Sequence, residues 1–261
     1  MSRRLHRQLI CTSSLVILIA LAGCAGITMF DTVDSLMREG RELYDAKQYD
    51  QAIAKFEQVI TKDNTYWLAY LYVARSYIAK NDWLPAITNA RKAFQLAPAG
   101  ENVVPTFAEA LFGGGMAELR QAHFSEAIGH FVEYIRVKPT DATGYLNLGK
   151  AYLGNGSYAD ALSALLKGLG QGGDAGVRGN LVQSLLDGGL QALSRGDARS
   201  AIGFLQEYVN HNPGNLTAYM NLGKAFWQAG ETGQAVDAFR RVLELSPGNT
   251  EALRFLMGIR P

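Results

Sequence analysis

The sequence predicts an all-α protein built from six repeated helix pairs, and three observations support this prediction. The string NLGKA occurs at residues 147–151 and again at 221–225, inside two longer stretches that also match. Small residues recur at positions 8 and 20 of a repeating unit of about 34 residues, and proline follows four of the units' second helices. Repetition at this period is typical of proteins whose helix pairs stack on one another.

Each predicted unit opens with a helix, and the units begin at Val33, Trp67, Ala108, Ala142, Val182 and Leu216. Position 20 is alanine in every unit, and position 8 is occupied by Gly40, Ala74, Gly115, Gly149, Gly189 and Gly223. Small residues at both offsets predict a close crossing of two helices, with position 8 of the first opposite position 20 of the second. A glycine inside a helix costs about 1 kcal/mol relative to alanine, so its recurrence needs a packing reason.

The second helix of each unit carries further marks. Proline occupies position 32 at Pro98, Pro139, Pro213 and Pro247. Because proline lacks a backbone N–H, it ends the second helix. Large side chains stand at position 24 in Phe56, Phe131, Leu165, Leu205 and Phe239, with Ala90 as the exception.

These marks together resemble the tetratricopeptide repeat family over residues 33–249. The second, fourth and sixth units follow the family pattern closely. The third and fifth depart from it with Glu118 and Ala192 at position 11, where the family prefers an aromatic residue, and the first lacks the proline. The resemblance implies a right-handed superhelical solenoid of six helix-turn-helix units with a C-terminal capping helix.

The third and fourth units repeat as the fifth and sixth, so the sequence indicates three pairs of repeats. The pairs span residues 33–100, 108–175 and 182–249, linkers lie at 101–107 and 176–181, and residues 250–261 form the capping helix. Terminal helices of solenoids need a polar outer face. Phe255, Met257 and Ile259 leave this one apolar, which indicates a homodimer through the C-terminal helix. The alternative is that the end of the chain folds back on itself.

Residues 1–23 are typical of a secretory signal, with three arginines before an apolar run from Leu9 to Ala22. The order Leu21-Ala22-Gly23-Cys24 resembles the lipobox of bacterial lipoproteins, in which the cysteine becomes the new N-terminus and carries the lipid. That resemblance implies lipid attachment at Cys24, a tether over residues 24–32 and, from the neutral Ala25, an outer membrane lipoprotein facing the periplasm. The alternative is a simple secreted protein with an incidental cysteine.

Processing at this site changes the charge of the chain. Removal of residues 1–23 takes away three arginines and no acidic residue, so the formal charge changes from +1 to −2. Phosphate backbones are bound by a clustered basic excess, so nucleic acid is not an expected partner. The only other cysteine, Cys11, leaves with the signal, so no disulfide is expected.

In the family, the first helices of successive repeats line a concave groove through positions 2, 5, 6, 9 and 12. Position 9 places Arg41, Arg75, Met116, Lys150, Leu190 and Lys224 there, position 6 adds Asn147 and Asn221, and positions 5 and 12 add Phe112 and Trp227. The resemblance implies an apolar floor with a broken row of cations, suited to a protein or peptide ligand with apolar anchors and a carboxylate. The alternative is that the apolar residues pack between first helices and the cations are merely solvated. The family's carboxylate clamp is not reproduced.

Motifs for catalysis are weak or missing. His130 with Glu133 and His123 with Glu126 have the spacing of a metal pair, but a bundle site would need matching carboxylates from other helices. The glycine-rich stretch 168–176 lacks the lysine and threonine or serine of a phosphate-binding loop. We therefore expect no enzyme activity, no catalytic residue, no cofactor and no metal.

The predicted function is a non-catalytic protein–protein interaction scaffold or assembly factor at the cell envelope, with partner segments in the concave groove and the membrane bound through the N-terminal lipid. The alternative is an accessory lipoprotein of a type IV pilus, secretion or polysaccharide-export machine. A hydrolase or metal enzyme carried on the solenoid is a further class, which the missing motifs disfavour.

Overall fold

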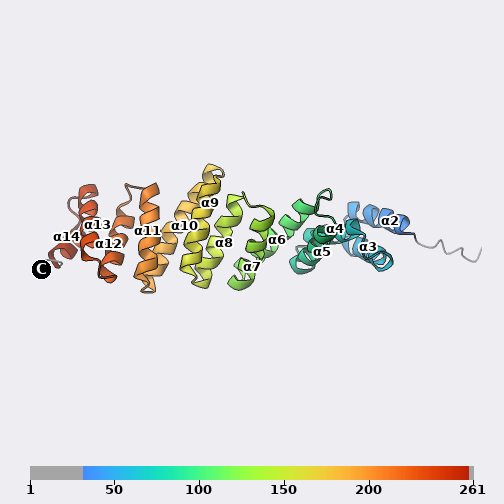
Figure 1. Ribbon diagram of the computed structural model, residues 1–261, viewed down its shortest axis with the longest axis horizontal. Helices are drawn as coiled ribbons and strands as arrows, with labels where there is room; N and C mark the ends of the chain where they lie inside the picture. The colour runs from blue at the N-terminus through green and yellow to red at the C-terminus, as the bar shows by residue number, and fades with distance from the viewer. Residues whose placement is uncertain (1–31, 259–261) are drawn as a thin grey trace, which may run out of the picture. The chain divides into compact units, whose positions relative to one another are not determined.

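Every regular element in residues 32–258, the part of the chain that the computed structural model describes, is an α-helix. Thirteen helices follow one another in this range with short turns between them (Figure 1). Their bounds are α2 Val33–Asp45, α3 Tyr49–Lys62, α4 Trp67–Ala79, α5 Trp83–Leu96, α6 Val103–Arg120, α7 Phe124–Val137, α8 Ala142–Asn155, α9 Tyr158–Gln171, α10 Ala175–Ser194, α11 Ala198–His211, α12 Leu216–Gln228, α13 Thr232–Leu245 and α14 Thr250–Gly258.

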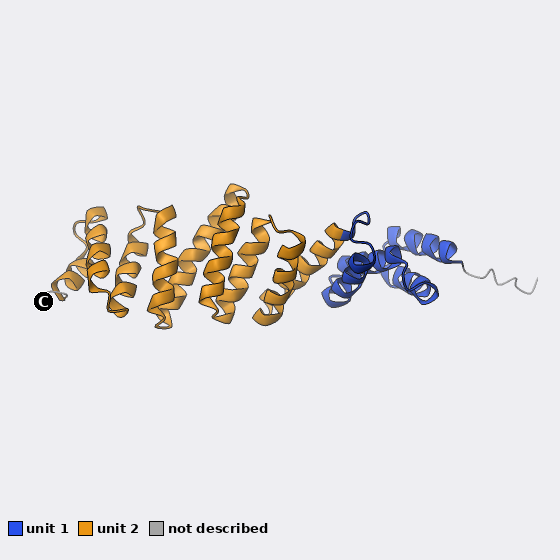
Figure 2. Ribbon diagram, viewed as in Figure 1, with its two compact units in different colours: residues 1–103 blue, residues 104–261 orange. Residues whose placement is uncertain are grey.

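The chain divides into two compact units (Figure 2). Unit 1 ends at Val103 and contains α2 to α5. Unit 2 begins at Val104 and contains the rest of α6 and all of α7 to α14. The boundary falls inside the first predicted linker, residues 101–107.

The two predicted linkers are helical for most of their length, which differs from the expectation. Residues 103–107 form the first turns of α6, and residues 176–181 belong to the start of α10. In α10 the buried Leu181 and Leu185 are four residues apart, so the apolar face continues N-terminally from the repeat. Asp174 caps the helix by accepting a hydrogen bond of 2.8 Å from a backbone N–H three residues later.

Consecutive helices pack on one another within each unit. In unit 1, α2 packs on α3, α3 on α4 and α4 on α5, and in unit 2 each helix from α7 to α14 packs on the next. First helices of neighbouring repeats also touch, namely α2 with α4, α8 with α10 and α10 with α12. This pattern confirms the predicted all-α solenoid of stacked helix pairs.

The close crossing inside each pair depends on position 8, where the nearest side-chain atoms belong to position 24. Position 20 also lies close, as predicted, because a Cβ atom on Gly149 would lie 3.6 Å from the backbone oxygen of Ala161. A Cβ atom added to Gly40 would lie 2.5 Å from the ring of Phe56, and one added to Gly223 would lie 2.6 Å from the ring of Phe239. The same relation joins Gly115 to Phe131, Gly149 to Leu165 and Gly189 to Leu205. Protein interiors leave no room for such overlaps, so the large residue at position 24 requires the glycine.

The second repeat is the exception, and its two positions change together. Ala90 replaces the large residue at position 24, and Ala74 replaces the glycine at position 8. Both alanines are completely buried. Because a small side chain at position 24 vacates space, a methyl group fits at position 8. The sizes at these two positions are therefore complementary in all six repeats.

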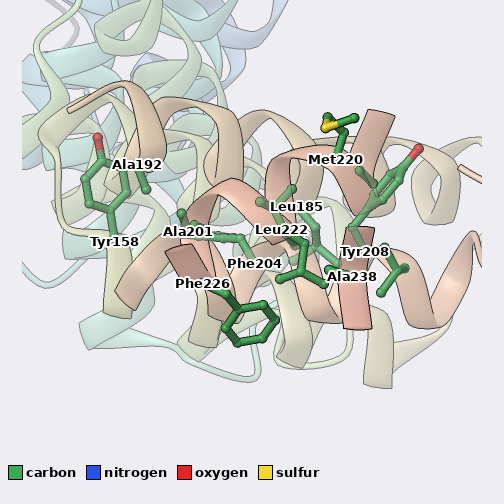
Figure 3. Packing of buried hydrophobic residues seen from close by; sticks show 14 of the residues in the cluster. Tyr158, Leu185, Ala192, Ala201, Phe204, Tyr208, Met220, Leu222, Phe226 and Ala238 are labelled. Carbon is green, nitrogen blue, oxygen red and sulfur yellow. The ribbon is translucent and has the colours of Figure 1, made fainter. Parts of the chain in front are cut away.

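The core of unit 2 contains a continuous cluster of buried side chains from α8 to α14, part of which is drawn in Figure 3. Phe204, Leu205 and Phe239 are completely buried there, as is the alanine at position 20 of each repeat in the cluster. Unit 1 has its own cluster around Leu36 and Phe56. Burial of this apolar surface supplies the main force that holds the helices together.

Two hydrogen bonds link the second helix of one repeat to the first helix of the next. In unit 2 the Tyr134 hydroxyl donates to the carboxylate of Asp141, which also accepts the backbone N–H of Thr143 at 2.8 Å and so caps α8. In the corresponding place, Asn215 caps α12 and donates from its amide to the Tyr208 hydroxyl at 3.0 Å. These contacts join successive repeats.

Burial alone would raise the pKa of the Asp141 carboxyl, but its hydrogen bonds to Tyr134 and to the backbone outweigh burial and lower that pKa. Burial and the bond to Asp141 raise the pKa of Tyr134 far above its ordinary value. The tyrosine therefore remains a proton donor and the aspartate an acceptor at neutral pH.

Within residues 32–258, none of the helices has the length and apolar character that crossing a membrane requires.

Candidate partner-binding cleft

A cleft of about 410 Å³ in unit 1 contains two of the predicted site residues. It is lined by Arg41 of α2, by Trp67, Leu68, Leu71, Tyr72 and Arg75 of α4, and by Glu101 and Asn102 of the turn that follows α5. The two arginines occupy position 9 of the first helices α2 and α4, and these two helices contact each other.

Local structure explains why these side chains face the cleft. In α4, Leu68, Tyr72 and Arg75 follow at intervals of four and three residues, so they share one face of the helix. Thr32 caps α2 by accepting a hydrogen bond of 3.1 Å from the backbone N–H of Ser35. This cap defines the start of α2, the helix that carries Arg41.

Both guanidinium groups lie over tyrosine rings. The Arg41 Cζ atom is 5.3 Å from the ring centroid of Tyr72, and the Arg75 Cζ atom is 5.4 Å from that of Tyr44 and 5.5 Å from that of Tyr72. The rings of Tyr44 and Tyr72 meet edge to face, with centroids 5.6 Å apart. Tyr72 also stacks on Phe56, a completely buried residue, which anchors the group to the core.

A cation–π contact with a ring does not use up the N–H groups of a guanidinium, which can still donate to an acceptor. Among residues 32–258, neither Arg41 nor Arg75 forms an ion pair with a carboxylate. The cleft therefore presents two oriented cations whose hydrogen-bonding edges have no acidic partner from the described chain.

The remaining wall of the cleft is apolar with one acidic residue at its rim. Leu71 is 2% exposed, whereas Trp67 and Leu68 are half-buried. A Cβ atom on Gly100 would lie 3.1 Å from Trp67, so the turn approaches the indole closely. The next residue, Glu101, is exposed and accepts a hydrogen bond of 3.4 Å from the amide of Asn102.

In unit 2, the apolar residues predicted for the groove are more deeply packed than expected. The ring of Phe112 lies 5.9 Å from that of Phe131 and 5.4 Å from that of Tyr134, Met116 packs on the same cluster, and Leu190 is half-buried. At position 5, Met37, Leu71, Leu146 and Met220 are between 2% and 5% exposed. These position 5 side chains belong to the core between first helices, so they do not form the expected exposed apolar floor.

The polar residues predicted for unit 2 have partners in most cases. The amides of Asn147 and Asn221 donate to the carbonyl oxygens of the residues four positions earlier, at 2.9 Å and 2.8 Å. Lys224 forms an ion pair of 2.7 Å with Glu251 of α14. Lys150 is exposed, and Trp227 remains 42% exposed.

Trp227 also borders a second cavity, of about 400 Å³, which Glu251, Arg254, Phe255 and Gly258 complete. On α14, Phe255 stacks on Phe239 with ring centroids 4.6 Å apart, so this helix covers the last repeat as predicted for a capping helix. Met257 is 67% exposed beside it.

The residues considered for a metal do not converge. His123 pairs with Glu118 at 2.8 Å instead of with Glu126. Among residues 32–258, no three histidine, cysteine or acidic side chains gather as metal ligands. The predicted lipid attachment site, Cys24, lies outside the described residues.

Sequence reasoning missed several residues of the cleft, although the register already placed two of them. Leu68 and Tyr72 stand at positions 2 and 6 of the second repeat, which belong to the groove positions of the pattern. No comparable signal pointed to Glu101 and Asn102, because they enter the cleft through the turn between repeats.

Comparison with protein families gives a match to the tetratricopeptide repeat over residues 37–101, 112–175 and 186–250. The chain belongs to the tetratricopeptide repeat family. Each matched segment spans two consecutive helix pairs. Tetratricopeptide repeat proteins generally act as protein–protein interaction scaffolds, without enzymatic activity of their own.

Individual relatives are distant. Superkiller protein 3 of Schizosaccharomyces pombe is 28% identical in an alignment of 149 residues that covers 44% of this chain and only 11% of that protein. A solved structure of Naa15/Naa10 bound to HypK-THB aligns with 88% of this chain and 34% of its own, at 15% identity and a TM-score of 0.53. YrrB, described as a tetratricopeptide repeat protein with an unusual peptide-binding site, aligns with 77% of this chain and 97% of its own, at 17% identity and a TM-score of 0.43. These two structures are similar to the chain in fold alone.

Proposed function

We propose that this tetratricopeptide repeat protein is a scaffold or assembly factor of the bacterial cell envelope that holds segments of partner proteins against its first helices. The observation that carries the proposal is the cleft of unit 1, where two arginines without acidic partners adjoin half-buried apolar side chains. Concave sites that combine apolar walls with a few oriented polar groups are typical of ligand-binding surfaces.

The envelope part of the proposal rests on the sequence. Cys24 follows an apolar signal in the order of a lipobox, and Ala25 favours the outer membrane, with the repeats facing the periplasm. An accessory role in a type IV pilus, a secretion system or a polysaccharide exporter is the more specific form of the same proposal. A homodimer through α14 is a further part, supported by the exposed Met257 and Trp227.

The scaffold function is tested by photo-crosslinking in the native host, with one photoreactive residue per variant. Arg38 of α2 and Lys150 of α8 represent exposed positions on first helices, and Gln58 of α3 and Ser163 of α9 are matched exposed positions on second helices. We expect a discrete partner band from the first-helix positions and none from the second-helix positions.

The decisive comparison in this experiment is between the first-helix positions and the second-helix positions. Crosslinks that form only from Gln58 and Ser163 would place the partner on second helices and contradict the proposal. Crosslinks from no position at all, under conditions where the protein is abundant, would contradict the scaffold function itself.

A further inference from the structure

We infer that the cleft of unit 1 binds a linear protein segment with one acidic side chain beside apolar residues, an inference that rests on the proposed scaffold function. The acidic side chain lies against Arg41 and Arg75, and its apolar neighbours cover Trp67 and Leu68. The contacts of the two arginines support the acidic side chain, and the exposure of Trp67 and Leu68 supports its apolar neighbours.

The cationic wall is prepared for a carboxylate before any ligand arrives. Tyr72 lies within 5.5 Å of both guanidinium carbons, so one ring orients both arginines. Ordering long side chains on binding normally lowers affinity, and here the cation–π contacts with Tyr44 and Tyr72 already restrict both arginines. A guanidinium is weakly hydrated and presents two parallel N–H groups, which match the two oxygens of a carboxylate.

The apolar wall determines what must flank the acid. Trp67 and Leu68 are half-buried in the free protein, and the cavity of about 410 Å³ is within the usual size of small ligand sites. An aromatic or aliphatic neighbour would remove the remaining surface of these side chains from water. A peptide that carried only acids would leave this wall uncovered.

Glu101 restricts the number of acidic side chains that the bound segment can carry. Glu101 lines the same cleft, and its negative charge repels a second carboxylate that approaches from that side. The cleft therefore favours a single acidic side chain over an acidic run. Substitution of Glu101 should consequently strengthen binding, in the direction opposite to substitution of the arginines.

The test uses the full chain purified in detergent and fluorescence anisotropy of dye-labelled peptides. The main probe is the octapeptide Gly-Ser-Leu-Glu-Phe-Gly-Ser-Gly, acetylated at its N-terminus and amidated at its C-terminus. Its matched control has glutamine in place of glutamate. A third peptide carries the glutamine and ends at phenylalanine with a free carboxylate, which separates a side-chain acid from a chain terminus.

We expect the glutamate peptide to bind roughly tenfold more tightly than the glutamine peptide, because the paired arginines recognise the charge. Combined Arg41→Gln and Arg75→Gln should abolish this difference, and Glu101→Gln should increase affinity for the glutamate peptide a few-fold. Lys92→Gln removes an exposed cation from α5, outside the cleft, and should change neither affinity. Circular dichroism of each variant verifies that the helices are intact.

Each contrary outcome overturns the inference separately from the scaffold function. Equal affinity for the two amidated peptides would show that the cleft does not recognise an acidic side chain. Binding of the free-carboxylate peptide alone would assign the arginines to a chain terminus. Failure of all three peptides to bind at millimolar concentration would exclude the cleft as the anchoring site, while first-helix crosslinks would still support a scaffold with another site.

Discussion

In the five repeats that have glycine at position 8, a single added methyl group would change how closely two helices cross. Gly223 is buried against the ring of Phe239, whose nearest atom would lie 2.6 Å from an added Cβ. Gly129 is also inside a helix, yet an added Cβ there would meet no atom within 4 Å. The same substitution at these two sites therefore separates packing from helix propensity.

We predict that Gly223→Ala lowers the free energy of unfolding by about 1–3 kcal/mol, because the core cannot accept the extra volume. Gly129→Ala should raise it by about 0.4–1 kcal/mol, because alanine restricts the unfolded chain and favours the helix. Urea unfolding followed by circular dichroism measures both changes. The packing explanation fails if the two variants change stability in the same direction.

At the scale of helices, the contact between Tyr134 and Asp141 joins α7 to α8. We predict that Tyr134→Phe lowers the free energy of unfolding by about 1.5–3 kcal/mol, because it removes a hydrogen bond to a charged group. Tyr208→Phe is the matched variant, where the lost partner is the neutral Asn215, and its cost should be about 0.5–1.5 kcal/mol. Equal losses in the two variants would show that the charge of Asp141 contributes nothing.

The same contact predicts a dependence on pH. The pKa of Asp141 is lowered in the folded protein, so its contribution to stability is complete above the unfolded value of about 3.9 and is lost as pH falls through the folded value. Asp141→Asn reproduces the arrangement of Asn215 in a later repeat and cannot titrate. Urea unfolding between pH 6 and pH 3 should show a smaller acid loss for this variant than for the natural chain, and parallel curves would contradict the assignment.

At the scale of the whole molecule, the proposed tether and the proposed homodimer can be tested on one variant. Cys24→Ser removes the acylation site, so we expect the chain to accumulate unprocessed or to become soluble in the periplasm, measured by immunoblotting and fractionation. A processed form of this variant that fractionates normally with the membrane would refute the lipid anchor. Ser35→Ala, which leaves the lipobox unchanged, serves as the processing control.

The soluble Cys24→Ser chain should form a dimer if α14 is a contact surface. Light scattering as a function of concentration should then show twice the monomer mass, and Met257→Ser in the same background should shift the equilibrium toward monomer, because it removes an exposed apolar side chain. A purely monomeric chain at high concentration would remove the homodimer from the proposal.

The sequence by itself determined the helices and their pairing. Helices that begin at Val33, Trp67, Ala142 and Leu216 start where the repeat pattern predicted, because capping residues, small residues and prolines act locally. The starts of α6 and α10 were predicted too late, since the apolar face of these helices continues into segments that look like linkers in the pattern. The repeat pattern predicts only the residues that the repeats have in common, and the N-terminal extensions of α6 and α10 are not among them.

Tertiary structure alone decided which predicted site residues lie together. The register placed Arg41 and Arg75 on one surface, but only the folded unit 1 shows that Tyr72 orients both of them and that Glu101 enters the same cleft. It also shows that Lys224 is already paired with Glu251. The physical reason is that helix periodicity determines the direction of a side chain, whereas its partners come from segments far away in the sequence, which only packing brings into contact.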